Sequence, residues 1–118
     1  MDSGDIRGGG ICVRVYFGER DRFHGETLWS ALLKYLRGEG AAGATITRGI
    51  AGYGAHSKIH AASIVDLSSD LPLLLEWVDS EERVARLLPT LEAMVQGGMI
   101  TTHPVSVIHY QPHTDRVQ

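Results

Sequence analysis

The sequence predicts an α+β domain in which two helices pack on the same face of an antiparallel sheet. Two segments each carry one apolar stripe at helical spacing, and the segments around them have the alternating or continuous apolar patterns of strands. The expected order is β-α-β-(β)-β-α-β, where the bracketed strand is an extra extended segment. Each helix has one apolar stripe to bury, and both stripes enter the same core only if both helices lie on the same face of the sheet.

The first strand and the first helix are expected in the N-terminal third of the chain. Residues 1–10 are rich in glycine and lack an apolar period, so we expect a disordered leader, with structure beginning at Ile11. Apolar residues then alternate up to Phe17, as in a strand with one face on a core. After a charged turn, Thr27 is a suitable N-cap for a helix that ends near Arg37, where glycines follow. The apolar stripe of this helix comprises Leu28, Leu32 and Leu36.

Extended segments are expected on both sides of a glycine-rich turn in the middle of the chain. Residues 44–50 predict a second strand, the sequence AGYG at 51–54 predicts a turn, and residues 59–67 predict the extra extended segment. Residues 71–78 are apolar apart from Glu76, which is typical of a central strand covered on both faces.

The second helix and the last strand follow in the C-terminal third. Asp79 and Glu82 have the spacing of a capping box, which predicts a helix start. The apolar stripe of this helix comprises Val84, Leu87, Leu88, Leu91, Met94 and Val95. Pro89 should kink the helix, and the glycines at 97–98 should end it. The final strand is expected within residues 99–110.

These elements correspond to the split βαβ, or ferredoxin-like, arrangement. Its helices cover one face of the sheet and leave the other bare. We expect Leu74, Val78, Ile46 and Ile108 on that bare face, where they would form an apolar patch. The sequence therefore predicts a homo-oligomer whose subunits bury their sheets against one another.

Length and composition limit the possible classes of protein. The chain has 118 residues, which suits one domain, expected at 11–110 with a tail at 111–118. No apolar run reaches the about 18 uncharged residues of a membrane-spanning helix, and no secretory signal is present, so we expect a cytoplasmic protein. The only cysteine, Cys12, is expected to be a buried hydrophobe, and the net charge of −3 argues against nucleic acid as a partner.

Residues 11–110 resemble the DUF190 family, which is grouped with the PII-like signalling proteins. The segments that carry the resemblance are Gly18-Glu19 with Arg22, the run of residues 43–49, residues 52–54, Ile59-His60, Leu71-Pro72 and residues 78–80. The resemblance implies a ferredoxin-like trimer with ligand sites in the clefts between subunits. It also implies a loop after the second strand that reports the state of the ligand to a partner protein.

The chain departs from the PII pattern at the positions that hold nucleotide phosphates in PII proteins. Those proteins have a Gly-Asp-Gly-Lys-Ile turn and an Ile-Arg-Ile-Arg last strand. The corresponding residues here are 96–100, with Met99 in the place of the lysine, and 107–110, which contain no arginine. Each lost charge-assisted hydrogen bond is worth about 1.5 to 3 kcal/mol, so ATP binding in the PII manner is not expected.

Other residues could bind an anion in place of the missing cations. The candidate cations are Arg20, Arg22, Arg48 and Lys58. The candidate backbone donors and their neighbours are Gly52, Tyr53, Gly54, Gly97 and Gly98. We hypothesise that an adenine nucleotide or another small anion binds there, with Tyr53 stacking on a base or docking into a partner. The alternative interpretation is that the glycines only make turns, the arginines form surface ion pairs and Tyr53 is a hydrophobic lid over the loop.

A metal site is a weaker alternative. His56 and His60 are four residues apart and would share a face if the segment were helical, but it is equally compatible with an extended chain. The runner-up interpretation is therefore a structural or metal-binding trimer similar to the CutA proteins.

No motif in the sequence supports catalysis. The chain contains no GxSxG, Walker A or GxGxxG pattern, so we do not expect an enzyme. We expect a PII-like regulatory protein that signals through residues 52–59. By analogy with the wider PII group, its partner would be a membrane transporter or an enzyme.

Overall fold

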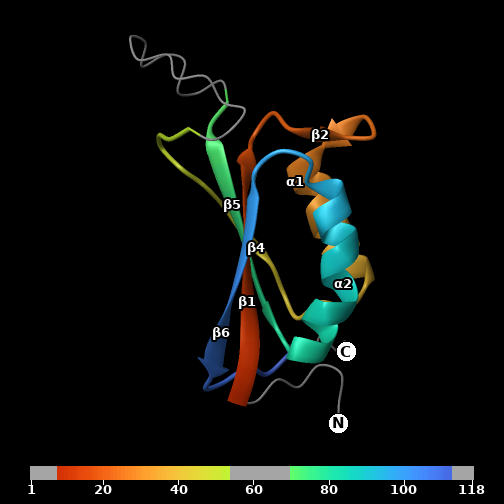
Figure 1. Cartoon of the computed structure of the whole chain (residues 1–118), viewed down its shortest axis with the longest axis vertical. Coiled ribbons are helices and arrows are strands. Elements are labelled where there is room, and N and C mark those ends of the chain that lie inside the picture. The colour runs from red at the N-terminus through yellow and green to blue at the C-terminus, as the bar shows by residue number, and fades with distance from the viewer. Residues whose placement is uncertain (1–7, 54–69, 113–118) are drawn as a thin grey trace, which may run out of the picture.

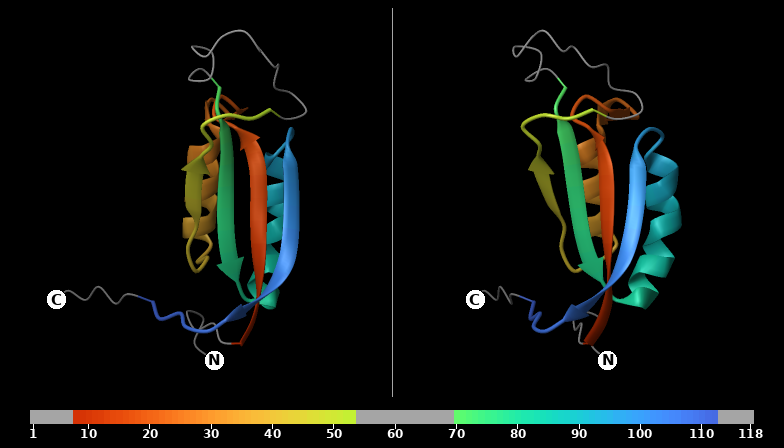
Figure 2. Two further views of the ribbon diagram at one scale, coloured as in Figure 1. Left: turned by 90° about the vertical axis from the view of Figure 1, so that its left-hand side faces the viewer. Right: turned by 60° about the vertical axis from the view of Figure 1, so that its left-hand side comes forward.

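The computed structural model describes residues 8–53 and 70–112 and has the predicted two-layer architecture (Figure 1). One antiparallel sheet has the order β4-β5-β1-β6. Its strands are β1 (Gly8–Gly18), β4 (Thr45–Arg48), β5 (Pro72–Asp79) and β6 (Met99–Val107). The helices α1 (Leu28–Gly38) and α2 (Glu81–Met94) lie on one face of this sheet (Figures 1 and 2). This is the ferredoxin-like topology that the sequence predicts.

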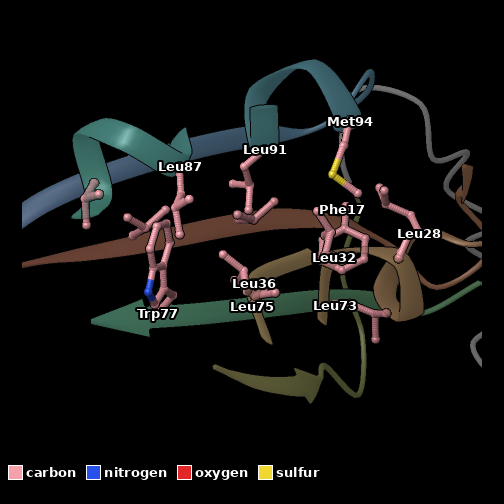
Figure 3. Packing of buried hydrophobic residues seen from close by; sticks show 14 residues of the cluster. Phe17, Leu28, Leu32, Leu36, Leu73, Leu75, Trp77, Leu87, Leu91 and Met94 are labelled. Atoms are coloured by element: carbon pink, nitrogen blue, oxygen red, sulfur yellow. The ribbon is translucent and has the colours of Figure 1, made fainter. Parts of the chain in front are cut away.

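The core lies between the helices and one face of the sheet (Figure 3). Every second residue of β1 and β5 points into it, including Val15 and Trp77, which are fully buried. Both helices present the apolar stripes that the sequence predicts. The buried stripe residues are Leu28, Leu32 and Leu36 of α1, and Val84, Leu87, Leu91 and Met94 of α2.

The capping box predicted at Asp79 and Glu82 is wrong. Ser80 is the N-cap of α2, and its side chain accepts a hydrogen bond from the backbone N–H of Arg83 at 3.1 Å. Asp79 is the last residue of β5 and is completely buried, where its carboxylate accepts hydrogen bonds from the Trp77 indole and the backbone N–H of Ser80. The helix continues through Pro89 and ends at Met94.

The first strand is longer than predicted. β1 begins at Gly8, since residues 8–10 pair with residues 105–107 of β6, so the expected start at Ile11 is wrong by three residues.

Several predicted segments lie outside the described residues: residues 1–7, the extra extended segment at 59–67 and most of the expected tail at 111–118. Within the described residues, no helix has the length and hydropathy needed to cross a bilayer.

A short hairpin between β1 and α1 was not predicted. Its strands are β2 (Arg22–Phe23) and β3 (Glu26–Thr27), joined by His24 and Gly25. Both loop residues have positive φ, 47° and 85°, as in a type I′ turn. Thr27 occupies the predicted N-cap position of α1, although its side chain makes no capping hydrogen bond.

The sheet face opposite the helices is bare among the described residues, and its members differ from those expected. Leu74 and Val78 lie on it, as predicted. β5 is therefore covered on one face only, and the prediction of a strand covered on both faces is wrong for the described residues. Ile46 instead packs against the core, because it pairs with Leu75 on the helix side. Ile108 lies beyond the end of β6 and is 91% exposed.

An ion pair and the cysteine also lie on this face of the sheet. The Arg14 guanidinium donates to Glu76 across β1 and β5 at 2.8 Å, and this hydrogen bond raises the pKa of Arg14. Cys12 is buried, as predicted, and burial raises the pKa of its thiol. The face therefore combines apolar side chains with one ion pair near its centre.

Candidate ligand site at one end of the sheet

Four strand ends bring the predicted site segments to one end of the molecule (Figure 2). In the antiparallel register, Gly18 is paired with Pro72, Arg48 with Leu73, and Met99 with Tyr16. β1 and β4 therefore end where β5 and β6 begin. The connections that contain the candidate arginines and glycines share this end of the sheet, which we call the ligand end.

The loop after β1 is held by two carboxylates. Asp21 accepts a hydrogen bond from the backbone N–H of Gly18 at 3.1 Å, and Gly18 O accepts one from the N–H of Asp21 at 3.1 Å. Asp70 accepts from the backbone N–H of Arg20 at 3.0 Å. The amides of this tight turn are thus already bound by protein groups and are not free to bind an anion.

An ion pair joins this loop to the end of β4. The Arg48 guanidinium donates to the Glu19 carboxylate, and the Arg48 side chain remains 60% exposed whereas that of Glu19 is 23% exposed. The backbone of Glu19 is itself anchored, because its N–H donates to Leu71 O at 2.9 Å. Arg48 therefore lies at the surface with part of its donor capacity unused.

Glycines allow the chain leaving β4 to pass close to β5. The N–H of Gly49 donates to Pro72 O at 2.7 Å, and a Cβ at Gly49 would lie 2.9 Å from Pro72 Cγ. A Cβ at Gly52 would lie 3.1 Å from the same atom. Tyr53 follows and is 72% exposed, so its ring is available to a ligand or a partner.

The glycine turn before β6 has a structural explanation. Gly98 has a φ of 124°, and a Cβ there would lie 2.1 Å from Tyr16 O. Only glycine fits this approach of the turn to β1. Gly97 precedes it in the same connection, which lies at the ligand end.

The other predicted cations differ in their surroundings. Arg22 donates to Gly25 O at 2.7 Å and so supports the β2–β3 turn. The Arg20 side chain is exposed and has no partner within residues 8–53 and 70–112. The remaining candidates lie outside the described residues: Gly54, His56, Lys58 and His60. In the part of the chain that the structure describes, no three metal-ligating side chains gather.

The site residues predicted from the sequence do not include the acidic half of this site. Among the described residues, Glu19, Asp21 and Asp70 place negative charge beside Arg20 and Arg48, and so offset part of the positive charge at the ligand end. Asp21 was a usable signal, because aspartate is favoured in turns, where its side chain accepts backbone N–H groups. The contacts of Asp70 and Glu19 depend on strand pairing and have no local signal.

The family of the chain follows from comparison with known proteins. The model of DUF190, described as Uncharacterized ACR, matches residues 10–107. The chain belongs to the DUF190 family. A UPF0166 protein of Methanocaldococcus jannaschii is 39% identical to this DUF190 chain over 89 residues, which cover 75% of this chain and 82% of the relative. A UPF0166 protein of Aquifex aeolicus is 34% identical over 97 residues, covering 82% and 91%.

Solved structures of PII-like proteins share the fold of this DUF190 chain. A putative PII-like signalling protein of Thermus thermophilus matches with a TM-score of 0.58 and 19% identity, covering 86% of this chain and 91% of that one. CPII of Thiomonas intermedia, a nitrogen regulatory PII-like protein bound to ADP, AMP and bicarbonate, matches with a TM-score of 0.57 and 18% identity, covering 84% and 94%. These likenesses establish a PII-like fold.

Proposed function

We propose that this DUF190 protein is a PII-like regulatory protein that binds a small anionic ligand at the ligand end, between subunits of a homotrimer. The observation that carries the proposal is the convergence of four strand ends with exposed Arg20 and Arg48 beside them. An adenine nucleotide is the first candidate ligand, because the structurally similar CPII is bound to ADP, AMP and bicarbonate.

The chemistry of the ligand end suits an anion that carries an aromatic group. Arg20 and Arg48 would attract phosphate or carboxylate oxygens, and the exposed ring of Tyr53 would stack on a base. Arg22 contributes positive charge while it supports the hairpin. Since three carboxylates offset the arginines, this interpretation favours a ligand with few charges over a triphosphate.

The bare face of the sheet supports the proposed homotrimer. Tyr16 and Val78 are 36% and 37% exposed on the two central strands, with Leu74 beside them. Burying this face between subunits would remove the apolar patch from water. It would also bring the ligand ends of neighbouring subunits together, as intersubunit ligand binding requires.

Residues 52–59 would transmit the signal, because they continue directly from the chain that leaves β4 beside Pro72. A ligand at Arg48 or Tyr53 would change the conformations available to this loop. The partner that reads it would be a membrane transporter or an enzyme in the cytoplasm. The proposal assigns the chain a regulatory role and no reaction.

A thermal-shift experiment tests the proposed function. The panel contains AMP, ADP, ATP, bicarbonate, ZnCl2 and CuCl2, and a ligand at about 100 times its Kd adds about 2.7 kcal/mol of stability. We expect ADP or AMP to raise the Tm of the wild type and to raise that of Arg48→Ala less. Arg86→Ala is the matched control, because Arg86 pairs with Glu39 at the opposite end of the molecule.

Two outcomes would contradict the proposal. If none of the anions raises the Tm, the proposed binding of an anionic ligand is wrong. A response to zinc or copper alone would favour the CutA-like metal-binding trimer instead.

A further inference from the structure

The Glu19–Arg48 ion pair lies where the proposed ligand would place its anionic group. Glu19 belongs to the loop after β1 and Arg48 ends β4, so the pair crosses the ligand end between two connections. The Arg48 side chain is 60% exposed, which leaves guanidinium N–H groups accessible from solvent. A ligand oxygen and the Glu19 carboxylate would therefore use the same cation.

The position of Glu19 is set by its backbone. Its N–H donates to Leu71 O at 2.9 Å, and the following N–H, of Arg20, is held by Asp70 at 3.0 Å. A side chain on such an anchored loop loses less conformational entropy when it pairs with Arg48 than one on a free loop would. The contact is thus built into the unliganded fold.

The neighbouring carboxylates are engaged in a different way. Asp21 and Asp70 accept backbone N–H groups of the loop, at 3.1 and 3.0 Å, whereas Glu19 accepts from a guanidinium. Neutralising Asp21 or Asp70 would loosen the turn. Neutralising Glu19 would leave the turn in place, and the Arg48 guanidinium would no longer be paired with the Glu19 carboxylate.

We propose that Glu19 is an internal competitor for the anionic ligand, and that binding exchanges the Glu19 carboxylate on Arg48 for an oxygen of the ligand. This inference rests on the proposed function, since it concerns the affinity of the same site. Glu19 weakens binding in two ways, because it occupies the cation and because its own charge repels the incoming anion. It thereby sets the ligand concentration to which the protein responds.

The test is isothermal titration of the full chain with ADP, AMP and bicarbonate at constant ionic strength. We expect Glu19→Gln to lower the Kd for the anion that binds the wild type by about two- to fivefold, as expected when an exposed ion pair no longer competes. Glu19→Ala should act in the same direction. Glu39→Gln is the matched control, because it removes the same charge from the Glu39–Arg86 pair at the other end of the molecule, and its Kd should stay within about twofold of wild type.

The variants also separate the two ideas. If the gain from Glu19→Gln disappears in an Arg48→Ala background, the exchange at Arg48 is supported. If the wild type binds ADP but Glu19→Gln and Glu19→Ala bind it equally well or more weakly, the competitor role is overturned and the proposed function stands. If neither the wild type nor any variant binds the three anions, the proposed function fails, and this inference fails with it.

Discussion

At the residue scale, Asp79 is the most constrained polar group among the described residues. It is 0% exposed and accepts hydrogen bonds from Trp77 Nε1 at 3.0 Å, from the backbone N–H groups of Ala42 and Ser80 at 2.9 and 2.8 Å, and from the Arg83 guanidinium at 2.9 Å. A buried carboxylate is tolerated when it is paired and fully hydrogen-bonded in this way. Asp79 therefore links the end of β5, the start of α2 and the chain before β4.

Asp79→Ala should destabilise the fold strongly. The substitution leaves buried donors without an acceptor and the Arg83 charge without this partner, which costs about 3 to 5 kcal/mol. Urea unfolding followed by circular dichroism measures the loss as a lower midpoint. Glu39→Ala, which removes a carboxylate from an exposed pair, should change stability by less than about 1 kcal/mol. Equal effects of the two substitutions would show that Asp79 has no special structural role.

At the element scale, turns explain where the sequence prediction failed. His24 and Gly25 form a two-residue loop with positive φ at both positions, and the rings of Phe23 and His24 stack at 4.1 Å. A His-Gly pair is a weaker turn signal than Asn-Gly, so a charged turn was predicted where a hairpin forms. The capping box failed for a related reason, because Ser80 is also a good N-cap and only packing identifies Asp79 as a core residue.

Gly25→Ala should destabilise the hairpin by about 1 to 2 kcal/mol, the cost of placing a Cβ in the left-handed region. The effect comes from the backbone alone, because a Cβ at Gly25 would have no atom within 4 Å. Gly43→Ala is the control, since it also has open space but its φ lies outside the left-handed region, so it should be neutral or slightly stabilising. Thermal melts of both variants give the comparison, and an equally stable Gly25→Ala would contradict the type I′ assignment.

At the scale of the whole molecule, the two faces of the sheet differ in how they are covered. The helices bury one face, and the other carries Tyr16, Leu74 and Val78 around the Arg14–Glu76 pair. The proposed trimer follows from this asymmetry, because a single subunit within the described residues offers nothing to cover the second face.

Val78→Asp should dissociate the proposed trimer, because it would bury an unpaired charge at each contact between subunits. Analytical ultracentrifugation would then detect monomers, with a loss of thermal stability. Trp29→Asp is the control, since Trp29 is similarly exposed, at 40%, but belongs to the helix layer. A Val78→Asp protein that remains trimeric would exclude this face as the interface.

Local pattern was sufficient for the helices, their stripes, the main strands and the order of these elements, because periods of 3.6 and 2 follow from backbone geometry. It could not place Ile46 on the core side, since a strand of four residues has no period long enough to identify its face without a pairing partner. Local sequence pattern also could not predict that Glu19, Arg48 and Asp70 come together. These residues are far apart along the chain, and antiparallel pairing alone brings the strand ends next to them to one edge, so the electrostatics of the candidate site arise only when the sheet forms.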